Sequence, residues 1–187
     1  YYTVGGCGAN IAWHTENDTL EIADRDILLR DIKVYLLAVL RNANNEVLPF
    51  DWRATAKEFA ETVDDYQAKA GSRFDLSASK KAVAELAAAL DGFYAGVKAG
   101  TIKPKAANTV IQDLARILVP INFTRVNRFR HDPALTIPPL PSIAPAAELD
   151  KFDDDTIGFA RTQLVRGQNR LVSALRQATR HIGLVTA

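Results

Sequence analysis

Residues 155–182, DTIGFARTQLVRGQNRLVSALRQATRHI, decide the class of the fold. Small or apolar residues recur in this stretch every three or four positions, at Ile157, Ala160, Leu164, Gly167, Leu171, Leu175, Ala178 and Ile182. This spacing places them on one narrow stripe of a helix, which is typical of a helix in the seam of a bundle. We therefore predict a long final helix from Asp155 to about Ile182, buried along one side.

Four stretches further upstream share this helical spacing, and the predicted helices run from about 24 to 44, 51 to 71, 75 to 100 and 104 to 120. Asp24 and Asp51 can cap the first two helices, because an aspartate side chain accepts hydrogen bonds from the free N–H groups of a first turn. Gly71 and Gly100 end the second and third helices, and Pro120 is expected to interrupt the fourth.

A Pro-rich segment separates these helices from the last one. Five prolines fall between residues 133 and 145, which disfavours both a helix and a central strand. We expect an extended crossover on the surface, and no stretch of the sequence predicts a strand. The predicted fold is all-α, a four- to five-helix bundle with a Pro-rich crossover before the last long helix.

The composition excludes several classes of protein. The chain has 187 residues, of which 48% are hydrophobic, enough for one substantial core. A net charge of +1 gives no strong field for nucleic acid, and no apolar run is long enough to span a membrane. One cysteine excludes an internal disulfide framework. Because the sequence opens on Tyr1 and lacks methionine, we expect further sequence upstream.

Two residues near the start could carry chemistry. His14 follows a Gly-rich approach, and a neutral imidazole is a good zinc ligand. The other histidines, His131 and His181, are far away in the sequence, so His14 alone is a weak signal. Cys7 could be a nucleophile with His14 as its base, or simply a small residue in a tight turn.

The predicted final helix carries arginines opposite its apolar stripe, at Arg161, Arg166, Arg170, Arg176 and Arg180. They could bind an anionic partner, in which case the chain would be a helical adaptor. The commoner outcome is a solvated face, or pairing with the acidic residues Glu58, Glu61, Asp64 and Asp65. Two segments, 17–19 and 122–124, also fit the acceptor pattern for N-glycosylation, which chance explains.

Three features together resemble a known family. Residues 13–19, WHTENDT, look like the aromatic-His-Thr stretch with the last zinc ligand of glutamate carboxypeptidase II-like peptidases. Residues 40–52, LRNANNEVLPFDW, are similar to the helix end and turn that open the helical domain of this family. The order of the later helices and the crossover also matches. The chain thus resembles the C-terminal, transferrin receptor-like dimerisation domain of an N-acetylated alpha-linked acidic dipeptidase-like zinc peptidase.

This resemblance implies a division of the chain. Residues 1–22 would be the tail of the peptidase domain, and residues 23–187 the helical dimerisation domain. His14 would bind zinc only in the full-length protein, and Trp13 would lie on the substrate side in place of a tyrosine. No catalytic residue belongs to this chain, and no zinc is expected in it when isolated. Residues 135–141 lack the lysine-tyrosine pair with which the carboxypeptidase holds the glutamate end of its substrate.

The resemblance also implies partners and a function. We expect a homodimer that supports an upstream peptidase domain of the same chain, without nucleic acid or membrane contact, in an extracytoplasmic or secreted protein. The residues expected in the core or dimer helices are Trp52, Phe59, Leu164, Leu171 and Leu175. Two alternatives stay open: the C-terminal part of an active zinc aminopeptidase or carboxypeptidase, or a receptor-like, inert interaction module.

Overall fold

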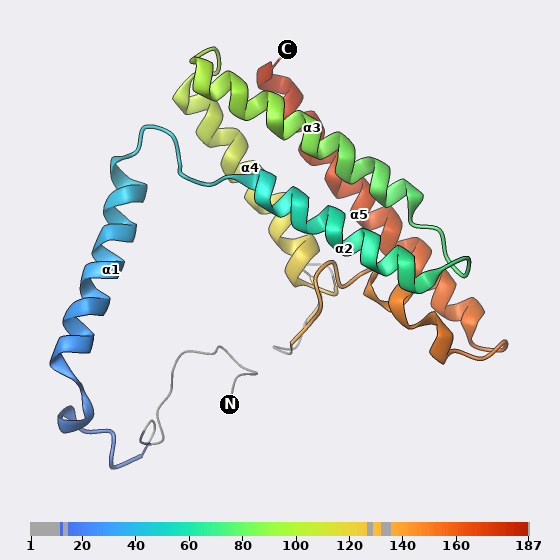
Figure 1. The fold of residues 1–187 in the computed structure, drawn as a ribbon, viewed down its shortest axis with the longest axis horizontal. Helices are drawn as coiled ribbons and strands as arrows, with labels where there is room; N and C mark the ends of the chain where they lie inside the picture. The colour runs from blue at the N-terminus through green and yellow to red at the C-terminus, as the bar shows by residue number, and fades with distance from the viewer. Residues whose placement is uncertain (1–11, 13–14, 127–128, 132–135, 187) are drawn as a thin grey trace. The chain divides into compact units, whose positions relative to one another are not determined.

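The computed structural model describes Ala12 and residues 15–126, 129–131 and 136–186. All regular structure in these residues is helical, which confirms the predicted all-α class (Figure 1). The elements are η1 (Leu20–Ile22), α1 (Arg25–Asn44), α2 (Trp52–Ala70), α3 (Ser77–Ala99), α4 (Pro104–Phe123), η2 (Ala144–Lys151) and α5 (Ile157–Thr186). They fall into two compact units, residues 1–49 with 134–136, and residues 50–133 with 137–187.

The first unit contains η1 and α1. Asp24 caps α1 as predicted, because its Oδ1 accepts hydrogen bonds from the N–H groups of Asp26 at 2.9 Å and Ile27 at 3.0 Å. The helix ends at Asn44, also as predicted. No residue of α1 is buried.

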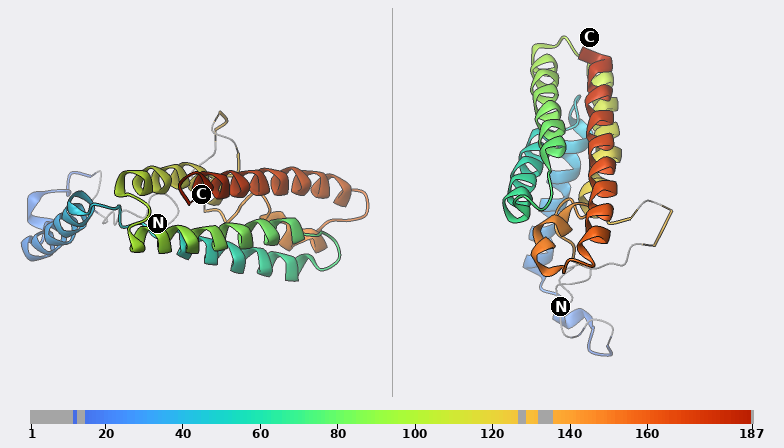
Figure 2. Two further views of the ribbon diagram at one scale, coloured as in Figure 1. Left: turned by 90° about the horizontal axis from the view of Figure 1, so that it is seen from above. Right: turned by 90° about the vertical axis from the view of Figure 1, so that its right-hand side faces the viewer.

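The second unit is a helical bundle. Helix α3 packs against α2 and α5, and α4 packs against α5, while η2 contacts α2 and α5 (Figure 2). Among the described residues, the largest fully buried side chains all belong to this unit. They are Phe59, Leu76, Leu86, Leu90, Phe93, Ile111, Leu114, Leu118, Leu140, Ile143, Leu149 and Leu164.

Local sequence signals set the ends of the bundle helices. Asp51 caps α2 by accepting the N–H of Arg53 at 3.0 Å, and Pro104 occupies the first turn of α4, where no N–H is needed. Gly71 and Gly100 end α2 and α3 with φ angles of 56° and 74°. These positive angles favour glycine because it has no Cβ to clash with the backbone.

The prediction that Pro120 interrupts the fourth helix is wrong, since α4 continues through it to Phe123. Proline removes one helical N–H, but only one further turn follows. Thr124 then closes the helix at the proline itself, where its N–H and its hydroxyl both donate to the Pro120 carbonyl, at 3.2 Å and 2.7 Å. Because Pro120 lies so close to the helix end, its missing N–H does not prevent the last turn of α4 from forming.

The segment before α5 is more buried than its prolines suggested. Leu140 and Ile143 are fully buried, so the expected surface position is wrong for them. Tyr66 donates its hydroxyl to the Pro139 carbonyl at 2.7 Å, and Asn122 accepts the Leu140 N–H at 3.1 Å. Because these polar backbone groups find partners, the segment can leave the solvent.

Candidate functional site

Three residues singled out from the sequence lie outside the described residues: Cys7, Trp13 and His14, the predicted zinc ligand. In the described part of the chain, no group of three or more His, Cys, Asp or Glu side chains could hold a metal ion. His181 has one acidic neighbour, with its Nδ1 3.5 Å from Oδ2 of Asp113. The part of the chain that the structure describes thus contains no cluster of zinc-binding side chains.

Four of the five predicted core or dimer residues lie inside the bundle. Phe59, Leu164, Leu171 and Leu175 are all buried within the second unit, so they pack its core and are not accessible to a second chain. Trp52 is half-buried at the start of α2. The indole Nε1 of Trp52 donates to the Ile111 carbonyl of α4 at 3.1 Å, which ties these two helices together.

A polar cluster surrounds the same helix start. The Trp52 N–H donates to the Tyr94 hydroxyl at 3.0 Å, and this hydroxyl donates to the Phe50 carbonyl at 2.7 Å. Arg53 stacks over the Tyr94 ring, 4.9 Å from its centroid, and its Nε lies 2.9 Å from Oδ1 of Asp51. The Arg53 hydrogen bond lowers the pKa of Asp51, whereas burial raises the pKa of Tyr94. These contacts fix the entry of α2 and show no reactive group.

The arginine row of α5 divides into separate environments. Arg161 donates its Nε to the Arg73 carbonyl at 3.0 Å, whereas Arg166 and Arg170 line a pocket. Arg176 and Arg180 do not line that pocket. The single continuous face expected from the sequence is therefore split by the packing of α5.

Three of the four acidic residues expected to pair with these arginines have lysine partners instead, and the fourth, Glu58, accepts a hydrogen bond from Asn122. Asp64 pairs with Lys80 at 2.7 Å, and Asp65 pairs with Lys69 at 2.7 Å. Glu61 lies 3.8 Å from Lys57. Three of these carboxylates are thus engaged by lysines rather than by the α5 arginines.

A cavity of about 360 Å³ in the bundle unit, which we call the arginine pocket, collects arginines from two segments. Arg125 and Arg130 follow α4, and Arg166 and Arg170 lie one turn apart on α5. No carboxylate is present among the described residues that line it. These lining residues are Arg125, Val126, Arg130, Pro141, Ser142, Gln163, Arg166, Gly167 and Arg170.

Arg170 also holds the chain that follows α4. Its guanidinium donates to the Arg125 carbonyl at 3.0 Å, to Thr124 Oγ1 at 3.2 Å and to the Val126 carbonyl at 3.2 Å. All three acceptors are uncharged. These bonds position the segment that carries Arg125 but leave the charge of Arg170 without a counterion at these contacts.

Gly167 allows the wall of the pocket to approach α5. A Cβ atom at position 167 would lie only 2.0 Å from the Ser142 carbonyl oxygen, a distance that no side chain tolerates. The Ser142 hydroxyl in turn donates to the Gly167 carbonyl at 3.4 Å. The missing side chain thus brings Pro141 and Ser142 against the helix, between the positions of the arginines.

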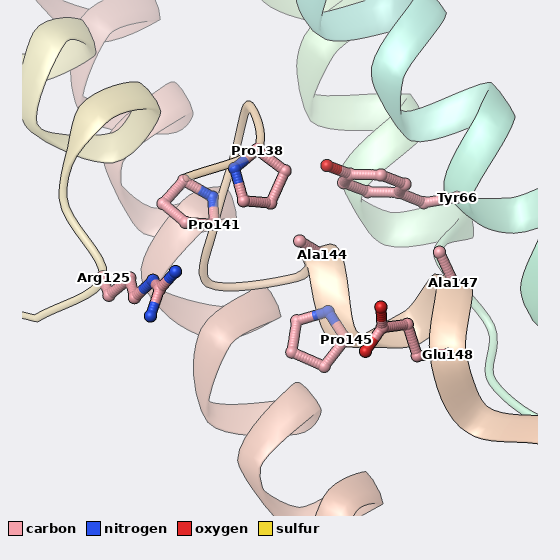
Figure 3. Close-up of a pocket in the computed structure, with 8 residues that line it drawn as sticks. All are labelled: Tyr66, Arg125, Pro138, Pro141, Ala144, Pro145, Ala147 and Glu148. Carbon is pink, nitrogen blue, oxygen red and sulfur yellow. The ribbon is translucent and has the colours of Figure 1, made fainter. Parts of the chain in front are cut away.

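A second cavity of about 400 Å³ shares Arg125 and Pro141 with the arginine pocket (Figure 3). Its wall consists mainly of proline and alanine, and Figure 3 shows Tyr66 and Arg125 on different sides of it. Burial, followed by the nearby charge of Asp65, raises the pKa of Tyr66. With its hydroxyl already donated to Pro139, Tyr66 is placed to support the segment rather than to react.

The sequence pattern located only half of the arginine pocket. Helical spacing predicted that Arg166 and Arg170 share a face of α5, but Arg125 and Arg130 were not considered. The sequence signal for these two arginines was the basic run RVNRFR at 125–130, directly after a helix end. Its place beside α5 depends on tertiary packing, which the spacing of residues does not encode.

The structure also decides between the two possible glycosylation sites. Asn122 is only 4% exposed, and its Nδ2 lies 3.4 Å from Oε1 of Glu58 while its Oδ1 binds the Leu140 N–H. A glycan cannot be attached there in the folded chain. Asn17 lies in an exposed turn, where its N–H donates to Thr15 Oγ1 at 3.2 Å.

Helix α1 presents the largest set of exposed apolar side chains among the described elements. Ten of its large apolar residues are between 45% and 74% exposed. They are Ile27, Leu28, Leu29, Ile32, Val34, Tyr35, Leu36, Leu37, Val39 and Leu40. These side chains are not covered within the unit that contains α1, and an apolar patch of this size is typical of a surface that packs against something else.

Comparisons of the chain with protein-family models, with curated proteins and with solved structures found no match. None of the described helices is both long and apolar enough to cross a membrane.

Proposed function

We propose that the chain is the homodimerisation and support domain of a zinc-dependent exopeptidase of the glutamate carboxypeptidase II type, and that it is not catalytic by itself. The exposed apolar surface of α1 carries the proposed support role, and the proposed dimer rests on the family resemblance. The resemblance of residues 13–19 and 40–52 to this family supports it, because these two segments flank α1 directly.

An isolated helix of this kind needs a partner. In proteins most of the stability of a helix comes from packing its apolar face, and α1 has 20 residues with none buried. Its apolar side chains occupy more than one stripe, as in a helix that is covered on several sides. We assign the cover to the upstream peptidase domain, since the resemblance places residues 1–22 in that domain.

The bundle is the part that we propose to dimerise. In this proposal it is a four- to five-helix bundle whose Pro-rich crossover, residues 133–145, precedes the last long helix. The boundary proposed from the resemblance, between residues 22 and 23, places α1 with the bundle. Contacts within the chain instead separate the compact units between Pro49 and Phe50. Zinc would be bound in the parent protein, with His14 as one ligand.

One experiment tests this function directly: the solution mass of the 187-residue chain by light scattering, together with its zinc content after dialysis. We expect a dimer without stoichiometric zinc, because one histidine cannot make a closed site. A monomer at high protein concentration would overturn the proposed dimer. One tightly bound zinc per chain would overturn the claim that the metal site is incomplete here.

A further inference from the structure

We propose that the arginine pocket binds a small phosphorylated molecule with two or more negative charges. Four arginines line a cavity of about 360 Å³, and no carboxylate is found among its described lining residues. This assignment does not depend on dimerisation or on zinc.

The charge of the pocket favours an anion. Arg130, Arg166 and Arg170 carry like charges around one cavity and repel one another, so an anion placed between them removes an unfavourable interaction. Guanidinium groups also bind phosphate oxygens through paired, charge-assisted hydrogen bonds. Arg166 and Arg170, one turn apart on α5, can both reach the same ligand, and Arg130 faces the cavity from the segment after α4.

The pocket is built rather than a chance grouping of mobile side chains. Three hydrogen bonds from Arg170 hold residues 124–126 beside α5. On the other side, Gly167 brings Ser142 against the helix, which adds a hydroxyl to the lining. A preorganised site binds its ligand with a smaller loss of conformational entropy.

The size and lining of the pocket argue for a small ligand. Cavities of roughly 300–1,000 Å³ are typical of sites for small molecules. No aromatic side chain is among the described lining residues, so a nucleobase would find no ring on which to stack. Ser142 and Gln163 supply uncharged hydrogen-bonding groups for the rest of the ligand.

The test is calorimetric titration of the full chain with inorganic pyrophosphate, in a low-salt buffer free of other multivalent anions. We expect one saturable site per chain, with an affinity that falls as salt is added. Arg166→Gln and Arg130→Gln should each weaken binding about tenfold, because each removes charge-assisted hydrogen bonds. Arg170, by contrast, also holds residues 124–126 beside α5, so its replacement would disturb the fold as well as the pocket.

The matched controls are Arg176→Gln and Arg180→Gln, on the same helix but outside the pocket. Both should leave pyrophosphate binding unchanged. Absence of binding, or equal weakening by all four variants, would overturn the proposal, as would binding of a long polyanion such as heparin without binding of pyrophosphate. Titrations with a phosphate monoester and with inorganic phosphate then show which source of phosphate the pocket prefers. Tighter binding of the monoester supports an organic ligand.

Discussion

The side-chain oxygen of Asn122 accepts a hydrogen bond of 3.1 Å from the backbone N–H of Leu140, and both residues are buried in the bundle. Leu140 has a φ angle of 46°, a left-handed conformation that side chains other than glycine adopt rarely. One polar side chain of α4 therefore satisfies the backbone at the point where the segment before η2 turns into the core.

Removing this side chain should destabilise the fold. Asn122→Ala leaves the Leu140 N–H buried without its acceptor, which costs about 1–3 kcal/mol. The strained turn at Leu140 also loses its anchor. Urea unfolding measures the change in free energy, with Asn169→Ala as a control on the exposed side of α5. An Asn122→Ala chain as stable as the control would show that another group satisfies this N–H.

Gly167 offers a sharper steric test. Gly167→Ala places a methyl group 2.0 Å from the Ser142 carbonyl, so either the segment or the helix must move. We expect a loss of about 1–3 kcal/mol or more in the free energy of unfolding, as for an overpacked core.

The matched control for Gly167 is Gly183→Ala in the same helix, where an added Cβ meets nothing within 4 Å. It should stabilise the chain by up to about 1 kcal/mol, because alanine favours the helix over glycine. Thermal unfolding of the two variants should therefore shift in opposite directions. A shift in the same direction would mean that Gly167 does not mediate a close approach.

Most helix ends could be predicted because their signals are local. Asp24, Asp51, Gly71 and Gly100 act within one turn of the residues they cap, so a sequence window contains all the physics. The burial of Leu140 depends instead on Asn122, a partner from another element. The prolines of the same segment predicted a surface position. That prediction failed for Leu140 because proline content carries no information about a hydrogen-bond partner on another element.

The arginine pocket shows the same limit. The period of α5 predicted that Arg166 and Arg170 share a face, but not that the segment after α4 returns to them. That return depends on the Arg170 hydrogen bonds to residues 124–126. No spacing rule contains these contacts, so Arg125 and Arg130 could not be predicted.

Helix α1 should tolerate polar substitution without loss of bundle stability. Ile32→Gln together with Leu36→Gln removes two exposed apolar side chains, 51% and 54% accessible. We expect the free energy of unfolding to change by less than about 0.5 kcal/mol, as for other surface sites. Binding of the apolar dye ANS should fall, because less apolar surface is open to it.

Leu171→Ala provides the contrast for this pair. Leu171 is fully buried in the bundle, and its truncation should cost about 2–5 kcal/mol through lost burial and the cavity left behind. If the α1 pair were as destabilising as Leu171→Ala, the apolar surface of α1 would be packed within this chain. The peptidase domain would then not be needed to cover it.

The cap of α2 predicts a response to acid. The hydrogen bond from Arg53 holds the pKa of Asp51 below its ordinary value of 3.8, so the folded state binds the proton less readily than the unfolded state. The stabilisation is therefore complete above pH 3.8 and is lost as the pH falls through the lower, folded pKa.

Asp51→Asn keeps a capping oxygen but cannot titrate. Between about pH 5 and pH 2.5, the Tm of the wild type should fall more steeply than that of the variant. Asp75 and Asp153, whose hydrogen bonds to Ser77 and Thr156 also lower their pKa, titrate in both proteins, so the difference isolates Asp51. Parallel curves would show that the Arg53 contact does not form in solution.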